Sequence, residues 1–183
     1  MTAQRRMPVT RTITGLDDAR ALLLALGAPA RLVRHAELVS EAAERLLELF
    51  AAHDLALDRA WVRAGAALHD VGKLEHRGEL ERPGSLHEPA GERLLTAHGV
   101  APHIARCCRS HAQWAALACE LEELVVALAD KLWKGARVPA LEQRVIEAAA
   151  ARAGRDLWAL FVPLDAGFEA IAEGASERLA RSV

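Results

Sequence analysis

Apolar residues recur every three or four positions along most of this chain, which is the spacing of one face of an α-helix. The clearest case covers residues 30–52, where glutamates occupy the opposite face. The apolar positions there are Leu32, Ala36, Val39, Ala43, Leu46 and Phe50. A second segment, residues 121–133, is the most apolar of the predicted helices, and Asp130 is its only acid after Glu123. The two patterns predict a long amphipathic helix and a buried helix, respectively.

Capping and turn residues divide the rest of the chain. Asp58 is placed to cap a helix that ends at Gly72, and Ser85 opens an S-x-x-E capping box. Pro163 is expected to interrupt the helical pattern of the C-terminal region. Together these patterns predict helices over residues 17–26, 30–52, 58–72, 85–98, about 104–111, 121–133, 139–154 and from 155 towards the end.

The composition indicates the fold class. Ala, Leu, Glu and Arg are abundant among the 183 residues, and Tyr is absent. Because the abundant residues are strong helix formers, the fold is predicted to be all-α, and the length suits one domain. We expect a flexible N-terminal arm over residues 1–15 and a single helical domain over residues 16–183, which ends in C-terminal helices over residues 139–181.

Charge and cysteine content limit the possible binding partners and the possible cellular location. The formal net charge is −2, and acids and bases are interspersed. No basic surface for duplex nucleic acid is therefore expected. The three cysteines form no spaced framework, which favours reduced thiols in a cytoplasmic protein. They are Cys107, Cys108 and Cys119.

One segment is similar to a secretion signal. Arg5-Arg6 precedes the apolar run 21–30, which contains Ala-Pro-Ala. The acids Asp17 and Asp18 just upstream favour a short surface helix instead. No apolar run approaches the ~20 residues that a membrane span needs.

Histidine and aspartate interrupt several apolar helix faces. Asp130 follows the run 125–129, and His35 and His111 also lie against apolar positions. Since a buried, unpaired carboxylate costs several kcal/mol, Asp130 needs a metal, a basic partner or a hydrogen-bond cluster. Imidazole and carboxylate together bind Zn, Mn, Fe, Co or Ni. Any single member is weak evidence, because a lone histidine or aspartate usually has a structural partner, but the ordered set indicates a metal site.

This order of residues resembles that of the HD superfamily of metal-dependent phosphohydrolases, which are all-helical proteins. The most specific part is the run His69-Asp70-Val71-Gly72-Lys73, and the resemblance covers about residues 35–134. It implies an HD-type helical bundle with a metal-binding core over about residues 31–134. It implies that His35, His69, Asp70 and Asp130 form the family's basic single-metal set.

Two further histidines, His87 and His111, match the dinuclear branches of the family, which include HD-type diadenosine tetraphosphatases. The resemblance then implies two divalent transition metals, Fe or Mn first and Co, Ni or Zn otherwise. Asp70 would bridge them, His35, His69 and Asp130 would complete one site, and His87 and His111 the other. The chain lacks the paired histidine and the GYP motif of HD-GYP phosphodiesterases, so a simpler nucleotide is favoured over a cyclic dinucleotide.

The implied activity is hydrolysis of a phosphoester or phosphoanhydride of a nucleotide or related small molecule by metal-activated water. Lys73 is placed either to neutralise a phosphate oxygen or to serve as a solvated loop cation. Arg109 and Trp114 are candidate substrate contacts, Trp133 is a candidate wall of the pocket mouth, and Lys131 is expected to point away from the metals. The competing functions are an HD-type mixed-valence di-iron oxygenase and a non-catalytic nucleotide-binding regulator.

Overall fold

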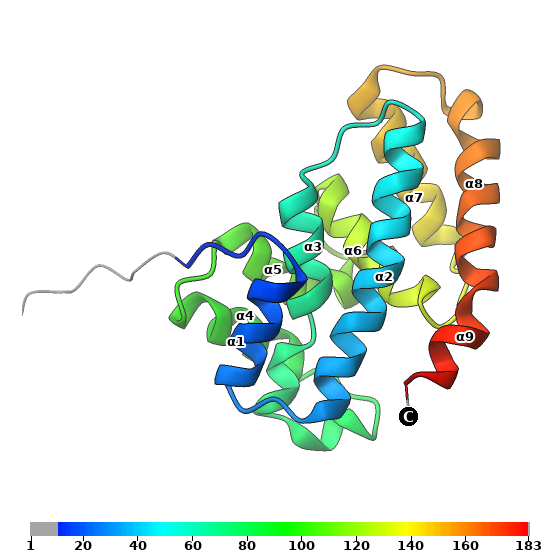
Figure 1. Cartoon of the computed structure of the whole chain (residues 1–183). Helices are drawn as coiled ribbons and strands as arrows, with labels where there is room; N and C mark the ends of the chain where they lie inside the picture. The colour runs from blue at the N-terminus through cyan, green and yellow to red at the C-terminus, as the bar shows by residue number, and fades with distance from the viewer. Residues whose placement is uncertain (1–10, 183) are drawn as a thin grey trace, which may run out of the picture.

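The computed structural model describes residues 11–182, and these form one bundle of helices (Figure 1). Within that range, the only strand-like pairing is an isolated bridge between Arg11 and Val100. The predicted all-α fold class is therefore confirmed. The elements are α1 (Leu16–Ala25), α2 (Ala30–Ala52), α3 (Arg59–Leu68), the 3₁₀ turns η1 (Val71–Leu74) and η2 (Arg77–Leu80), α4 (His87–Ala97), α5 (Pro102–Gln113), α6 (Leu121–Leu132), α7 (Pro139–Ala153), α8 (Leu157–Glu173) and α9 (Ala175–Ala180).

Helix α6 lies at the centre of the bundle. Every residue of α6 except Lys131 is buried, and the helix contacts α2, α3, α5, α7 and α8. One hydrophobic cluster surrounds α6, and a second joins α1, α3, α4 and α5. Because most α-helical stability comes from tertiary packing, the central position of α6 explains why residues 124–129 are apolar on all sides of the helix.

Several helix boundaries agree with the sequence pattern. Helix α2 covers the residues expected for it. Asp58 caps α3, and its Oδ1 atom accepts a hydrogen bond of 3.0 Å from the backbone N–H of Trp61. Helix α6 begins with a capping box that the sequence analysis did not identify, formed by Glu120 and Glu123.

The predicted end of the third helix was wrong. Helix α3 ends at Leu68, and Gly72 lies in the 3₁₀ turn η1. Gly72 does not have the positive φ angle of a left-handed helix cap. Its small size is required by packing instead, because a Cβ atom there would overlap the backbone carbonyl of His87 and the backbone nitrogen of Gly91. The glycine therefore permits close contact between η1 and α4.

The predicted S-x-x-E capping box does not form. Helix α4 begins at His87, and no side chain caps it from the preceding position. The carboxylate of Glu79, in η2, accepts the backbone N–H groups of Leu86 and His87 at 3.1 Å each. A distant carboxylate thus replaces the local cap that the sequence pattern predicted from Ser85.

The sequence pattern suggested that Pro163 interrupts the C-terminal region, but it does not interrupt the last long helix. It lies inside α8, which continues to Glu173. A proline inside a helix costs roughly 3 kcal/mol. The buried side chains of Leu160, Leu164 and Phe168 hold both sides of α8 against the core, and this packing offsets the cost.

The predicted N-terminal arm falls only partly within the described residues, since residues 1–10 lie outside them. Residues 11–15 pack on the domain rather than forming a free arm. The backbone N–H of Arg11 donates to the carbonyl of Gly99 at 2.7 Å, and Ile13 is buried. None of the helices in residues 11–182 combines the length and the apolar character that a membrane span requires.

Candidate metal centre

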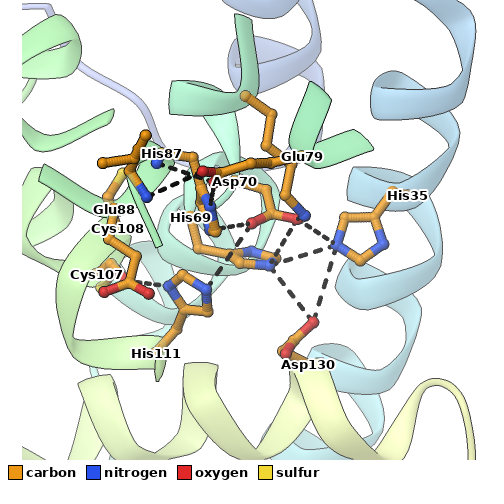
Figure 2. A network of polar contacts seen from close by, with 12 residues as sticks. His35, His69, Asp70, Glu79, His87, Glu88, Cys107, Cys108, His111 and Asp130 are labelled. Atoms are coloured by element: carbon orange, nitrogen blue, oxygen red, sulfur yellow. Dashed lines mark hydrogen bonds and ion pairs between the residues drawn. The ribbon is translucent and has the colours of Figure 1, made fainter. Parts of the chain in front are cut away.

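The side chains proposed as ligands from the sequence converge on one point between the helices (Figure 2). Each comes from a different part of the fold except for the adjacent pair after α3. All are buried apart from His35, whose side chain is 20% exposed. They are His35 from α2, His69 and Asp70 after α3, His87 at the start of α4, His111 near the end of α5 and Asp130 near the end of α6.

Asp70 lies between two groups of histidines. Its Oδ2 atom is 3.1 Å from Nε2 of His35 and 3.8 Å from Nε2 of His69. Its Oδ1 atom is 3.2 Å from Nε2 of His87 and 3.8 Å from Nε2 of His111. One carboxylate thus presents a different oxygen to each group.

Asp130 contacts the first group of histidines, His35 and His69. Its Oδ1 atom is 3.6 Å from Nε2 of His69 and 3.9 Å from Nε2 of His35. The donor atoms of His35, His69 and Asp130 all lie within 4.8 Å of one another, and so do those of His69, Asp70 and His111. Each group provides mixed nitrogen and oxygen donors of the kind that bind divalent transition metals.

The orientation of three histidine rings is fixed by acceptors on the side away from this point. Nδ1 of His69 is 2.9 Å from the carbonyl of Ala66, and Nδ1 of His111 is 3.1 Å from the carbonyl of Cys107. Nδ1 of His87 is 2.6 Å from Oε2 of Glu79. Because these oxygens can only accept, each Nδ1 carries the proton. With the proton on Nδ1, the Nε2 atom of a neutral ring presents its lone pair to the centre, which is the arrangement of metal-bound histidines.

These residues fit a cation. Nε2 of His35 and Nε2 of His69 lie 3.4 Å apart, so a proton or a cation must separate their lone pairs. Nε2 of His87 is buried and, within the described part of the chain, has no hydrogen bond of acceptable geometry despite its proximity to Asp70. Buried polar atoms are rarely left unpaired. A metal bound by these Nε2 atoms would separate the lone pairs of His35 and His69 and would give the Nε2 atom of His87 a partner.

The electrostatics of Asp70 and His111 favour the protonation states that metal binding needs. Burial acts to raise the pKa of Asp70, but the neighbouring imidazoles of His69, His35 and His87 lower it well below its ordinary value. Burial and the nearby His69 lower the pKa of His111 to about 3. Near neutral pH the carboxylate is ionised and His111 is neutral, so both can act as ligands. Burial acts to lower the pKa of His87, but its contacts with the carboxylates of Asp70 and Glu79 raise it above the ordinary value of 6.5, so a metal must displace a proton there.

Two lysines contact the carboxylates of the cluster. Nζ of Lys73 lies 2.5 Å from Oδ2 of Asp70. Nζ of Lys131 lies 2.7 Å from Oδ2 of Asp130, although its position on the helix suggested that it points away. The flexible stem of Lys131 turns the ammonium group back towards the neighbouring carboxylate, so the Cα direction does not determine where the charge lies.

A cavity of about 320 Å³ opens over the cluster. Five of the predicted ligands line it, namely His35, Asp70, His87, His111 and Asp130. Its other walls are Arg31, Leu32, Lys73, Leu80, Trp133, Lys134 and Ser182. Trp133 packs edge-on against His35, with ring centroids 5.2 Å apart. A small anionic molecule can therefore reach both the donor atoms and several cations.

Two predicted substrate contacts do not line this cavity. Arg109 forms an ion pair with Glu92 at 3.6 Å. The carbonyl of Trp114 accepts a hydrogen bond from the Arg144 guanidinium group, and its ring packs on the core. Arg31 and Lys134, which line the cavity, were not among the residues predicted from the sequence. The signal was their helical spacing, since Arg31 is four residues before His35 and Lys134 four residues after Asp130.

Comparison with protein families agrees with this geometry. The family model of the HD domain matches residues 32–134, which run from α2 to just beyond α6 and contain all the proposed ligands. The chain belongs to the HD-domain family. HD domains bind divalent metals and are typically metal-dependent phosphohydrolases. A search among curated proteins and a search among solved structures each gave no significant match.

Proposed function

We propose that this HD-domain protein is a metal-dependent phosphohydrolase that cleaves a phosphoester or phosphoanhydride of a nucleotide or related small molecule. The observation that carries the proposal is the central position of Asp70, whose two carboxylate oxygens face different sets of imidazole nitrogens. The cationic cavity above it supports a phosphorylated substrate, because Arg31, Lys73 and Lys134 line that cavity.

The same geometry supports a dinuclear centre with Asp70 as the bridging ligand. His35, His69 and Asp130 would hold one metal, and His87 and His111 the other. The unpaired Nε2 atom of His87 supports a second metal, because a single metal on the Oδ2 side leaves that buried atom without a partner. The nitrogen and oxygen donors suit Fe or Mn, and also Co, Ni or Zn.

When bound, such metals supply Lewis acidity and lower the pKa of a coordinated water. The protein residues position the substrate and stabilise its charge. In the hydrolysis, the water oxygen forms a bond to phosphorus and the bond from phosphorus to the leaving oxygen breaks. The leaving oxygen keeps the electron pair, and the proton that the water loses passes to solvent. Lys73 is held beside Asp70, where its ammonium group can donate to a non-bridging phosphoryl oxygen. We therefore propose Asp70 and Lys73 as the catalytic pair.

The alternatives are less well supported. A di-iron oxygenase could use the same donor atoms, but it does not by itself require three cations around its cavity. A non-catalytic nucleotide regulator needs neither the complete donor set nor the fixed Nδ1 partners of His69, His87 and His111. A cytoplasmic location stays a prediction from the cysteine content.

The test is a phosphoester panel assayed with Mn, Fe, Co, Ni, Zn and Mg in turn. It spans mononucleotides, cyclic nucleotides and dinucleoside polyphosphates, with metal content measured in parallel. We expect Asp70→Asn to lose activity by at least a hundredfold and to bind less metal. The control is Asp54→Asn, an exposed loop position whose positive φ angle Asn accepts. Substrate hydrolysis that persists in Asp70→Asn, or no hydrolysis of any substrate with any metal, contradicts the proposal.

A further inference from the structure

The cavity over the candidate metal centre meets a second, larger cavity of about 950 Å³. Arg31 and Ser182 line both, so they mark the boundary. The remaining walls of the outer cavity are Arg20, Leu24, Ala28, Ala30, Val33, Arg34 and Glu37. Arg31 therefore forms part of the wall of both cavities, and a molecule bound at the metal ligands lies beside the outer cavity.

Most cations around these cavities already have a carboxylate partner. Glu37 pairs with Arg34 at 2.8 Å and with Arg20 at 3.4 Å. Lys73, which lines the inner cavity, contacts Asp70 at 2.5 Å. Among residues 11–182, Arg31 and Lys134 are the cavity-lining cations that form no ion pair. Their charge is therefore available to a bound anion.

Both residues lie one helical turn from a proposed metal ligand. Arg31 precedes His35 by four residues on α2, so the two share a face of that helix. Lys134 follows Asp130 by four residues, just beyond the end of α6. Arg178 holds this end of α6 in place, because its guanidinium group donates to the carbonyls of Leu132 at 3.0 Å and of Trp133 at 2.8 Å. Both cations are thus fixed at their backbone relative to the metal ligands.

We propose that Arg31 and Lys134 form a subsite for a second phosphate group of the substrate, so that the protein prefers a phosphoanhydride to a phosphate monoester. This inference rests on the proposed hydrolase function. Arg can bind phosphate oxygens in a bidentate manner, and Lys adds a point charge. Leu24 and Val33 give the outer cavity an apolar wall for the remainder of the molecule.

The reaction assigned to this subsite is hydrolysis with the second phosphate in the leaving group. The water oxygen forms a bond to the phosphorus at the metal ligands, and the bond from that phosphorus to the bridging oxygen breaks. The bridging oxygen leaves with the electron pair on the second phosphate, and the protons of the water go to solvent. Arg31 and Lys134 face the negative charge that develops on this leaving group, so they stabilise the transition state as well as the bound substrate.

The first experiment measures binding without hydrolysis of a substrate. Metal-loaded protein is titrated with methylenediphosphonate, whose P–C–P link cannot be hydrolysed, and with inorganic phosphate by calorimetry at one ionic strength. We expect the wild type to bind methylenediphosphonate more tightly. The double variant Arg31→Ala/Lys134→Ala should lose roughly tenfold to a hundredfold in methylenediphosphonate affinity, with a change below about threefold for phosphate. The control is Arg45→Ala, an exposed position on α2 that lines neither cavity.

The second experiment measures kcat/KM for a nucleoside diphosphate and the monophosphate of the same nucleoside. The double variant should lose kcat/KM for the diphosphate by roughly tenfold to a hundredfold more than for the monophosphate. Equal losses for both substrates, or an equal loss in Arg45→Ala, overturn the subsite while leaving the hydrolase intact. If no substrate is hydrolysed, the proposed function fails, and calorimetry alone decides whether the subsite exists.

Discussion

Oε2 of Glu79 lies 2.6 Å from Nδ1 of His87, and the same carboxylate accepts the backbone N–H groups of Leu86 and His87. Glu79 therefore has two roles, as the cap of α4 and as the acceptor that fixes the protonated nitrogen of a proposed metal ligand. Burial acts to raise the pKa of Glu79, but its hydrogen bonds from His87 and Leu86 lower it. The carboxylate is thus ionised near neutral pH and can only accept.

Glu79→Gln is expected to weaken metal binding by roughly tenfold to a hundredfold, the range seen when the partner of a ligating histidine is removed. Glutamine has one acceptor oxygen, so it cannot serve both backbone N–H groups and the His87 ring. If its amide donates to Nδ1, the ring proton moves to Nε2 and blocks the ligand position. Metal affinity measured against a competing chelator tests this, and the ¹⁵N shifts of His87 report its tautomer.

The matched control for Glu79 is Glu75→Gln, which changes an exposed carboxylate whose ion pair with Arg93 spans 3.6 Å. Its metal affinity should equal that of the wild type. Unchanged affinity in Glu79→Gln, with an unchanged His87 tautomer, shows that Glu79 only caps the helix.

Gly72→Ala is expected to destabilise the fold by about 2–3 kcal/mol and to weaken metal binding. The added methyl group overlaps the backbone of His87 and Gly91, and neither can move without moving α4. Urea unfolding and metal titration measure the two effects. Gly78→Ala is the control, because its added Cβ atom meets only the end of the Arg82 side chain at 3.6 Å. Equal stability of the two variants contradicts the packing role of Gly72.

Local signals in the sequence were sufficient for the helices that carry the proposed ligands. The apolar periodicity of α2 fixed its length, and Asp58 marked the start of α3, because both depend on neighbours within a turn or two. The apolar run 124–129 of α6 indicated a buried helix. The selection of the six proposed ligands depended on the resemblance to HD-domain proteins, since no local rule brings His35 and Asp130 together.

The partners of the ligands could not be predicted from local pattern. Ser85 had the right spacing for a capping box, but the carboxylate of Glu79 reaches α4 from η2 and replaces it. Gly72 was expected to end a helix, whereas a glycine is required there because a side chain would overlap the backbone of α4. Both cases involve contacts between separate elements, and these depend on how the helices pack.

Arg178→Met is expected to lower the free energy of unfolding by about 2–4 kcal/mol. Methionine retains the apolar stem but leaves the carbonyls of Leu132, Trp133 and Ile171 without their donor. Arg181→Met is the control, because it removes a surface ion pair with Glu41, for which less than about 1 kcal/mol is expected. Urea unfolding compares them. A loss in Arg181→Met as large as that in Arg178→Met contradicts this account.

Glu122 joins three helices far from the metal centre. Its carboxylate receives Arg152 of α7 at 2.6 and 2.8 Å and the backbone N–H of Asp58 at 3.1 Å. Burial acts to raise the pKa of Glu122, but Arg152 and Asp58 lower it below the ordinary value of 4.5. The contribution to stability is therefore complete above pH 4.5 and is lost as the pH falls through the lower pKa of the folded state.

Glu122→Gln should accordingly be less stable than the wild type by about 1–2 kcal/mol at pH 7, a figure reduced by the partial exposure of Arg152. The difference should narrow as the pH falls below 4.5, because the wild-type carboxylate becomes protonated and loses its ionic hydrogen bonds. Urea unfolding at a series of pH values, with chelator present throughout, measures the difference without a contribution from metal release. Glu147→Gln, an exposed change on α7, should show no such dependence. A difference for Glu122→Gln that stays constant or widens in acid means that the charge of Glu122 does not stabilise the fold.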